Sequence, residues 1–251
     1  MAVPRKPGAA KDGAHDRPPL WARLDRPAPA PRQTLSPHRI ATTAVSVADA
    51  EGLDAITMRR LATELGVAPM AAYRYVSGKD ELLELMADHA YGELELPGDT
   101  TGWRETLREI ALRTRELMLK HLWLAQLPPS AMLAITPNRL AVAERSLRAV
   151  DGLGLDADTR MAVVNTVSSY THGVTGAEIA MRRLMAGQGW SSEQQVYSSM
   201  APQLTYLLGT GRYPGFRRYI HEGRHKDRPG WQFETGLDYV LDGIAARLSA
   251  Q

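Results

Sequence analysis

The hydrophobic positions of the chain recur at the spacing of α-helices from about residue 36 onward. Ser36 is a good N-cap, and Pro37 suits the first helical turn because the amide hydrogen that proline lacks has no partner there. Apolar side chains three or four residues apart then share one helical face; they are Ile40, Ala44, Val47 and Ala48. Since Glu51 and Gly52 end this pattern, it predicts a helix from residue 37 to about residue 51.

Two short helical patterns follow and meet at a sharp corner. The first is capped by Thr57 and ends at Gly66, a residue that readily adopts the left-handed backbone such a corner needs. Its apolar stripe consists of Met58, Leu61, Ala62 and Leu65. Pro69 opens the second, which is very short. Ser77 and Asp80 then resemble a capping box for a fourth, longer helix that continues into the 90s.

Beyond residue 102 the pattern stays helical, and no segment alternates apolar with polar residues as a strand would. The predicted helical segments are 103–124, 137–151, 157–186, 192–208 and 232–249. The chain is therefore predicted to be all-α. We divide it into a disordered, proline-rich basic arm over 1–33, an N-terminal helical domain with its connecting helix over 34–96, and a larger C-terminal helical domain over 97–251.

The arm carries more basic than acidic side chains, so contact with a phosphate backbone and a solvated tail without a role both fit it. Its basic residues are Arg5, Lys6, Lys11, Arg17, Arg23, Arg26 and Arg32. Only the run Pro19-Leu20-Trp21 looks able to dock on folded protein.

Composition narrows the class of protein further. The absence of cysteine excludes disulfides, thiolate nucleophiles and cysteine-ligated metal sites. No run of eighteen apolar residues and no apolar N-terminal segment is present, so we expect a cytoplasmic protein that does not interact with membranes. The net charge of +2 is too small to indicate nucleic acid by itself. No motif calls for a cofactor or a metal.

The corner between the two short helices has helix-turn-helix geometry, because a brace of neighbouring helices buries one face of the second helix and exposes the other. A protruding helix fits the major groove of B-DNA. Arg74 can fork onto guanine or phosphate, and the hydroxyls of Tyr73 and Tyr75 can donate to phosphate. A tight helical corner with a solvated basic face is the alternative.

The segment from Ser36 to Leu83 resembles the DNA-binding region of the tetracycline-repressor (TetR) family. The likeness rests on EGLDAITMRRLATELGV followed by MAAYRYVSGKDELL, in this order and spacing. It implies an N-terminal three-helix helix-turn-helix domain and double-stranded operator DNA as a partner. It also implies that family DNA-contact positions fall on Arg59, Tyr73, Arg74, Tyr75 and Lys79.

This sequence departs from the family where Ala68, Ala71 and Ala72 replace residues that are commonly larger or polar. We therefore expect Met70 and Ala71 to meet thymine methyl groups and Arg74 to be the main polar reader of bases. The full predicted DNA-binding set is Thr57, Arg59, Arg60, Met70, Ala71, Tyr73, Arg74, Tyr75 and Lys79.

In the C-terminal half, Trp103 opens a helix, a long helix covers about 157–186, and the chain ends on FETGLDYVLDGIAARL. With these features it resembles the ligand-binding and dimerisation domain of the tetracycline-type branch, which implies a homodimer and a small-molecule effector. Small residues on the long helix would allow close approach of a second copy; they are Gly173, Gly176, Ala177 and Ala180. The last helix would offer an apolar face made of Leu237, Val240, Leu241, Ile244 and Leu248. These faces would otherwise form intramolecular core.

A sensor needs a cavity with a few polar groups among apolar walls. The candidates for it are His89, Arg115, Met118, Trp123, Met132, Asn138, Asn165, Ser168, Ser169 and His172. Asn165, Ser168, Ser169 and His172 share one helical face. The family positions that hold tetracycline through an amide and an aromatic ring correspond to Ile110 and Thr114, which supply neither group.

Two other function classes fit the sequence less well. His221 and His225 form an HExxH pattern, but zinc hydrolysis needs an unbroken helix under both imidazoles, and Gly223 interrupts it. A helical adaptor that binds proteins without DNA would share the C-terminal bundle but has no use for the recognition helix. The sequence therefore predicts a dimeric, ligand-responsive transcriptional regulator, a repressor rather than an enzyme, with its operator and inducer undetermined.

Overall fold

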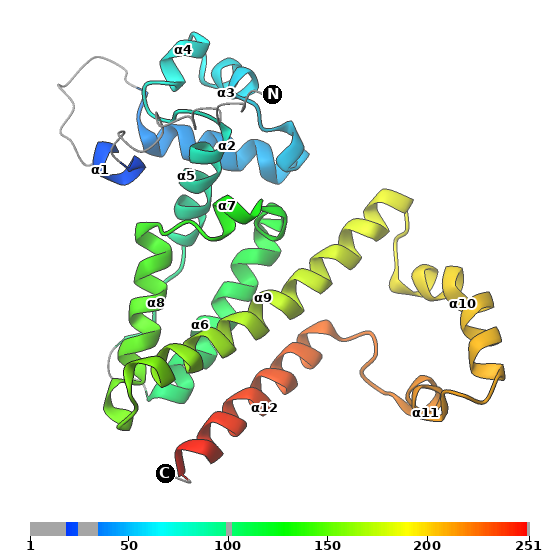
Figure 1. Ribbon diagram of the computed structural model, residues 1–251. Helices are drawn as coiled ribbons and strands as arrows, with labels where there is room; N and C mark the ends of the chain where they lie inside the picture. The colour runs from blue at the N-terminus through cyan, green and yellow to red at the C-terminus, as the bar shows by residue number, and fades with distance from the viewer. Residues whose placement is uncertain (1–18, 25–34, 99–101, 250–251) are drawn as a thin grey trace, which may run out of the picture.

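The computed structural model describes residues 19–24, 35–98 and 102–249. All regular structure in these ranges is helical (Figure 1), which confirms the predicted all-α fold. The α-helices in chain order are α1 (Leu20–Leu24), α2 (Pro37–Glu51), α3 (Met58–Leu65), α4 (Pro69–Ala72), α5 (Lys79–Tyr91), α6 (Trp103–Lys120), α7 (Pro129–Met132), α8 (Pro137–Ala149), α9 (Ala157–Gln188), α10 (Glu193–Gly209), α11 (Pro214–Glu222) and α12 (Pro229–Ser249). None of the helices in these three ranges is both long and apolar enough to cross a membrane.

Helices α2, α3 and α5 pack around one core and carry the short α4 at one end of the molecule (Figure 1). Side-chain caps explain where the first two begin. The hydroxyl of Ser36 accepts the Arg39 N–H at 3.1 Å, and the hydroxyl of Thr57 accepts the Arg60 N–H at 3.0 Å. Both predicted caps are therefore confirmed.

The start of α5 differs from the predicted capping box. Gly78 is the N-cap residue and offers no side chain, and the Ser77 amide donates to the carboxylate of Glu81 at 2.7 Å. The prediction that Asp80 would complete the box with Ser77 was wrong, because the carboxylate one residue further along reaches the free amide. The corner between α4 and α5 is thus held by Glu81.

The corner between α3 and α4 depends on the left-handed backbone of Gly66, whose φ is +67°. A Cβ added there would meet no atom within 4 Å, so only the backbone conformation opposes a side chain. We expect Gly66→Ala to lower the free energy of unfolding by about 1–2 kcal/mol, the cost of this backbone region for a residue with a Cβ.

Chemical denaturation measures that change. Gly187→Ala is the control, because Gly187 lies inside α9, has no positive φ and also has open space around it. Alanine is the better helix former, so the control should be stabilised by up to about 1 kcal/mol. Equal changes in the two variants would contradict the role given to the corner.

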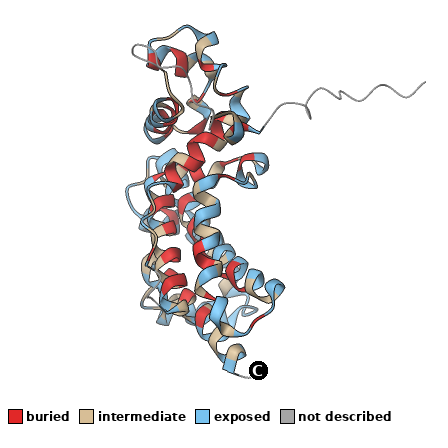
Figure 2. Ribbon diagram, turned by 90° about the vertical axis from the view of Figure 1, so that its left-hand side faces the viewer, coloured by how far each residue is buried: buried red, intermediate tan, exposed pale blue. Residues whose placement is uncertain are grey.

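The C-terminal part packs α6, α8, α9 and α12 side by side around a second core (Figures 1 and 2). In this core Leu237 and Leu241 of α12 are fully buried, and Phe233 joins them. Val240, Ile244 and Leu248 pack against the same cluster. Leu237 and Leu241, two of the residues predicted to meet a second copy, are therefore intramolecular core, because α6 and α9 of the same chain cover them. Val240, Ile244 and Leu248 remain half-buried, so their part in a dimer stays a prediction.

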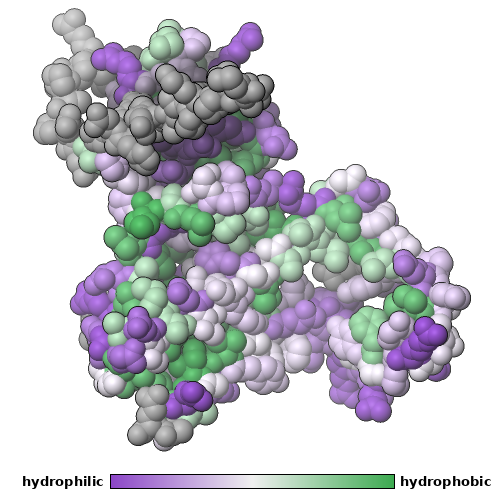
Figure 3. Space-filling view, in the orientation of Figure 1, coloured by the Kyte–Doolittle hydropathy of each residue, from purple (hydrophilic) through white to green (hydrophobic). Residues whose placement is uncertain are grey.

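Helices α10 and α11 stand away from both cores, on the right in Figure 1. Several large apolar side chains are exposed on them; they are Tyr197, Met200, Tyr206, Leu207, Tyr213, Phe216 and Tyr219. Figure 3 shows green, hydrophobic surface among white and purple surface on the unit at the right. A single chain therefore leaves this unit without a covering layer.

The predicted helix limits change most at 103–124 and 232–249, and one short helix appears in the arm. The helix expected over 103–124 ends at Lys120 and continues as a separate 3-10 turn, Leu122–Gln126. The last helix begins at Pro229, a residue suited to a first turn, rather than at 232. The prediction of a structureless arm was wrong for residues 20–24, which form α1, and the expected docking of Leu20 is confirmed because its side chain is buried. The rest of the arm, 1–18 and 25–33, lies outside the described residues.

Candidate nucleic-acid interface

Helix α4 and the turn after it present one face to solvent and bury the other. Ala72 and Val76 are fully buried against the N-terminal core. Met70 is 72% exposed, Tyr73 is 38% exposed, and Arg74 is exposed as well. The outward residues can therefore reach base edges without disturbing the core, which is what reading a major groove requires.

Basic residues flank this face on both sides. Arg59 is exposed in the first turn of α3, and Lys79 is exposed in the first turn of α5. The N-terminus of a helix attracts phosphate through its free amides and dipole. Thr57 is exposed too, although its hydroxyl already serves as the cap of α3. Ala71 is half-buried, so its methyl group has less reach than that of Met70.

The side chains of two residues predicted to contact DNA make hydrogen bonds within the protein instead. The guanidinium of Arg60 pairs with Glu51 at 2.7 Å and with Glu64 at 2.7 Å, and these hydrogen bonds raise the pKa of Arg60. The hydroxyl of Tyr75 donates to the Leu35 carbonyl at 2.5 Å, and its ring is half-buried. Both side chains therefore bind acceptors of the same chain here, and contact of either with phosphate stays a prediction.

A buried histidine joins the N-terminal domain to the rest of the chain. The ring of His121 is 2% exposed; its Nδ1 lies 2.8 Å from Asp49 of α2, and its Nε2 lies 3.1 Å from Glu93. The indole of Trp123 donates to Asp49 at 2.8 Å. Because carboxylates only accept hydrogen bonds, the His121 ring meets an acceptor at each of its two nitrogens. Sequence reasoning missed this network, whose members lie 28 to 74 residues apart.

Glu93 gives this network a dependence on pH. Partial burial alone would raise the pKa of Glu93, but hydrogen bonds from Lys120 and His121 outweigh it and lower the pKa. Its contribution to stability is therefore complete above the ordinary glutamate pKa of about 4.3 and is lost as pH falls through the lower folded value. We expect Glu93→Gln to reduce stability at pH 7 by less than about 1 kcal/mol, as for other solvent-screened pairs.

Thermal melts from pH 7 to pH 3 test this expectation. The gap between the wild type and Glu93→Gln should close as the pH falls. Glu95→Gln, a change at an exposed neighbour, should leave the acid profile unchanged. A gap that widens on acidification would show that the sign assigned to Glu93 is wrong.

Two of the predicted effector residues, Ser168 and His172, lie on α9 beside the end of α5, where His172 meets Tyr91, a residue that was not predicted. The hydroxyl of Tyr91 lies 3.0 Å from Nε2 of His172, whose Nδ1 lies 2.8 Å from the Ser168 carbonyl. Since a carbonyl only accepts, Nδ1 carries the hydrogen, and Nε2 accepts from the tyrosine. Burial of the imidazole ring disfavours its charged form and lowers the pKa of His172, although the residue as a whole is exposed. Arg139 lies over the Tyr91 ring at 5.1 Å.

Other predicted effector residues serve packing instead. Met118 and Trp123 are buried in the core shared with the N-terminal domain. Asn138 binds the carboxylate of Asp88 through its side-chain amide at 2.9 Å and through its backbone amide at 2.7 Å. Arg115 pairs with Glu178 at 2.6 Å. These residues were polar or large for structural reasons that spacing along one helix does not reveal.

The remaining predicted effector residues face outward. Asn165 and Ser169 are exposed on α9, and Met132 is 55% exposed on α7. His89 is half-buried and lies against α2, 3.3 Å from Thr42. The predicted set therefore does not line one cavity in the single chain, and the expectation of a common pocket is corrected.

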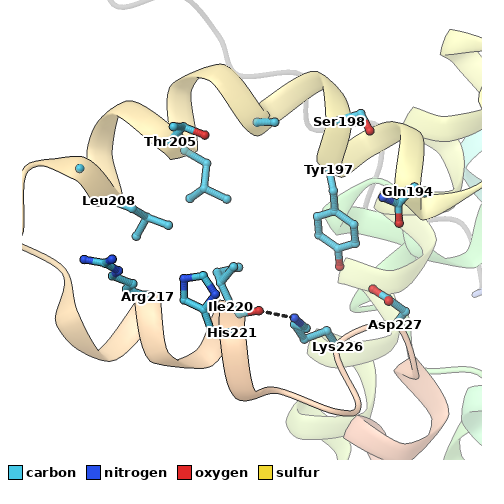
Figure 4. Close-up of a pocket in the computed structure, with 13 residues that line it drawn as sticks. Gln194, Tyr197, Ser198, Thr205, Leu208, Arg217, Ile220, His221, Lys226 and Asp227 are labelled. Carbon is cyan, nitrogen blue, oxygen red and sulfur yellow. Dashed lines mark hydrogen bonds between the residues drawn. The ribbon is translucent and has the colours of Figure 1, made fainter.

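A cavity of about 630 Å³ lies elsewhere, between α10 and α11 (Figure 4). Its wall is apolar at Leu208 and Ile220 and polar at Arg217 and His221, which are drawn in the close-up. Lys226 closes one side by donating to the Ile220 carbonyl. None of the predicted effector residues lines it.

The HExxH pattern is divided by the end of a helix. His221 lies in α11, which stops at Glu222 with Gly223 as its cap. His225 lies beyond that end and stacks on Trp231, with ring centroids 4.2 Å apart. Over 19–24, 35–98 and 102–249, no three histidine or acidic side chains are grouped as metal ligands. The two imidazoles therefore lack the helical register that a zinc protease uses.

Comparison with known proteins identifies the family. Residues 40–86 match the bacterial regulatory proteins of the tetR family, and residues 96–248 match the tetracyclin repressor-like C-terminal domain. The HTH-type transcriptional repressor DrrR1 of Streptomyces coeruleorubidus is 32% identical over 90% of this chain and 83% of its own length.

Solved structures agree with this assignment. The TetR family protein ActR of Streptomyces coelicolor, in complex with actinorhodin, has a TM-score of 0.69 at 27% identity, covering 86% of this chain and 97% of that one. BioQ with its natural double-stranded DNA operator has a TM-score of 0.53 at 30% identity, covering 61% of this chain and 93% of that one. The chain therefore belongs to the TetR family of bacterial regulatory proteins and is a DNA-binding transcriptional regulator.

Proposed function

We propose that the protein is a repressor that binds a near-palindromic operator as a homodimer and leaves it when a small molecule binds. The observation that carries this proposal is the outward face of α4 and of the turn after it, where Met70, Tyr73 and Arg74 are exposed opposite a buried inner face. Arg59 and Lys79 supply phosphate contacts on either side. The operator-bound BioQ structure supports this mode of binding. We expect the protein to act in the cytoplasm.

The homodimer rests on a stripe of small, exposed residues along α9. Gly173, Ala177 and Ala180 lie on one face of that helix and are exposed in the single chain, whereas Gly176 is half-buried. Small side chains let a second helix approach closely. The uncovered aromatic residues of α10 and α11 would also gain a covering layer from a second copy. Two-fold symmetry then presents two α4 helices to half-sites about one turn of DNA apart.

The effector site is proposed at the group formed by Tyr91, Arg139, Ser168 and His172. This group lies at the end of α5, the helix that continues from the DNA-binding domain into the C-terminal half. A ligand that favours a different arrangement of Tyr91 and His172 would shift the population of dimer conformations, and a coupling of about 1–3 kcal/mol changes operator affinity 5- to 150-fold. The complex of ActR with actinorhodin supports a small-molecule effector.

A reporter strain exposed to a chemical library tests the effector proposal, because the screen itself supplies the active compounds. Compounds that release the wild type should release Tyr91→Phe less readily, since this change removes only the hydroxyl that bonds His172. Tyr239→Phe is the control, because Tyr239 is 72% exposed on α12. Equal responses of both variants to every active compound would contradict this location.

The salt dependence of DNA binding distinguishes a DNA-binding regulator from the alternative, a protein-binding adaptor. The test uses a duplex that the wild-type protein enriches from a random pool. A regulator that neutralises about six to ten phosphates should lose about 10³- to 10⁵-fold in affinity between 50 and 200 mM salt. An adaptor would enrich no sequence and would show no such dependence.

A further inference from the structure

Helix α1 lies outside the part of the chain that matches the family, which begins at residue 40. It nevertheless packs on the DNA-binding domain. The side chain of Leu20 is 4% exposed and belongs to the same core as α2, α3 and α5. Trp21 and Leu24 are partly buried and pack against that core as well. A segment so short cannot be a stable helix on its own, so this docking holds it in place.

The guanidinium of Arg23 connects α1 to the corner between α4 and α5. One nitrogen lies 2.5 Å from the carboxylate of Glu81, and the other donates to the Tyr75 carbonyl at 3.4 Å. The two charged side chains are only 15% and 22% exposed. Glu81 also accepts the Ser77 amide. Arg23, Glu81 and the backbone of the corner therefore form one connected set of hydrogen bonds.

The ionisation of Glu81 agrees with this arrangement. Burial would raise the pKa of Glu81, but the hydrogen bonds from Ser77 and Arg23 outweigh it and lower the pKa. The carboxylate thus stays charged and continues to accept both donors at neutral pH.

Helix α4 has little of its own to hold it in position. It has four residues, and its N-cap, Ala68, makes no side-chain hydrogen bond. Its place is set by packing of Ala72 and Val76 and by what fixes the turn after it. Tyr75, in that turn, is held twice: Arg23 binds its carbonyl, and the Leu35 carbonyl accepts its hydroxyl. Both partners come from chain that precedes the family match.

We propose that α1 is a brace for the recognition helix, and that Arg23 is a positioning residue for operator binding through its contacts with Glu81 and the Tyr75 carbonyl. The proposal rests on the proposed function. It assigns Arg23 no contact with DNA, because both arms of its fork already bind protein acceptors. Removing the brace would let α4 and its turn sample orientations that do not match the groove, and binding would have to select among them.

The test compares full-length variants on the duplex that the wild type enriches from a random pool. Arg23→Ala is expected to weaken binding about 5- to 20-fold, a change of roughly 1–2 kcal/mol, with an unchanged slope of log affinity against log salt. Arg23→Lys should lose most of the affinity as well, because a single ammonium cannot reproduce the two-armed contact. Ala22→Ser, on the exposed side of α1, should stay within about twofold of the wild type.

Hydrogen exchange of the free protein adds a readout that does not depend on DNA. In Arg23→Ala the amides of residues 75–77 should exchange about 5- to 20-fold faster, whereas those of the α2 core should not change. If Arg23→Ala bound the duplex with wild-type affinity and its amides exchanged at the wild-type rate, the proposal that α1 is a brace would be overturned. A salt slope reduced by about one would also overturn it, because it would show direct contact with phosphate. If the wild type itself enriches no duplex, the proposed function fails, and the exchange result alone decides whether α1 supports the corner.

Discussion

Gly173→Arg is expected to leave the chain folded, make it monomeric and reduce its affinity for a two-half-site operator by about 10²- to 10⁴-fold. Gly173 is exposed on α9, and a Cβ there meets nothing within 4 Å in the single chain. Arginine is also the better helix former. Its charged side chain would occupy the close helix contact proposed for the second copy, so each half-site would then be bound independently.

Sedimentation and operator titration together measure this effect. The control is Gly152→Arg, since Gly152 is exposed outside α9 and also has open space around it. The control should remain dimeric and bind normally. A Gly173→Arg protein that stays dimeric would place the dimer contact elsewhere on the chain.

Arg74→Ala is expected to flatten sequence preference. Arg74 is exposed in the turn after α4, and its guanidinium can make a bidentate contact with guanine. A contact of this kind discriminates against the wrong base by about 1–3 kcal/mol. The ratio of affinities for the enriched duplex and a scrambled one should therefore fall about 5- to 150-fold at fixed salt.

Arg59→Ala gives the matched comparison for Arg74→Ala. Arg59 is exposed at the start of α3, where a phosphate contact is proposed. Its removal should weaken both duplexes alike and lower the salt slope by about one. If Arg74→Ala behaved in the same way and kept its selectivity, Arg74 would not be a reader of bases.

The parts of the fold that depend on near neighbours were predictable. The caps at Ser36 and Thr57 and the corner at Gly66 involve residues within three or four positions of one another, so a single sequence contains both partners. The helical periodicity likewise identified the longer elements, although it missed α7 and α11 and placed the start of the last helix too late.

Long-range partners were not predictable from spacing. Tyr75 has the right position to meet DNA, but its hydroxyl bonds a carbonyl 40 residues earlier. Leu237 and Leu241 of α12 looked suitable for a partner, yet α6 and α9 bury them. Polar residues that share a face of α9 divide between contacts within the chain, as at His172, and open solvent, as at Asn165. Periodicity indicates which residues share a face but not what covers that face.

The spacing of the half-sites decides whether two α4 helices dock at once. We expect the enriched duplex to be an inverted repeat whose two half-sites, about one turn apart, are contacted by one protein dimer. Inserting about five base pairs at its centre turns one half-site to the opposite side of the duplex, so affinity should fall at least about 100-fold. Unchanged affinity after this insertion would contradict the simultaneous docking of two α4 helices.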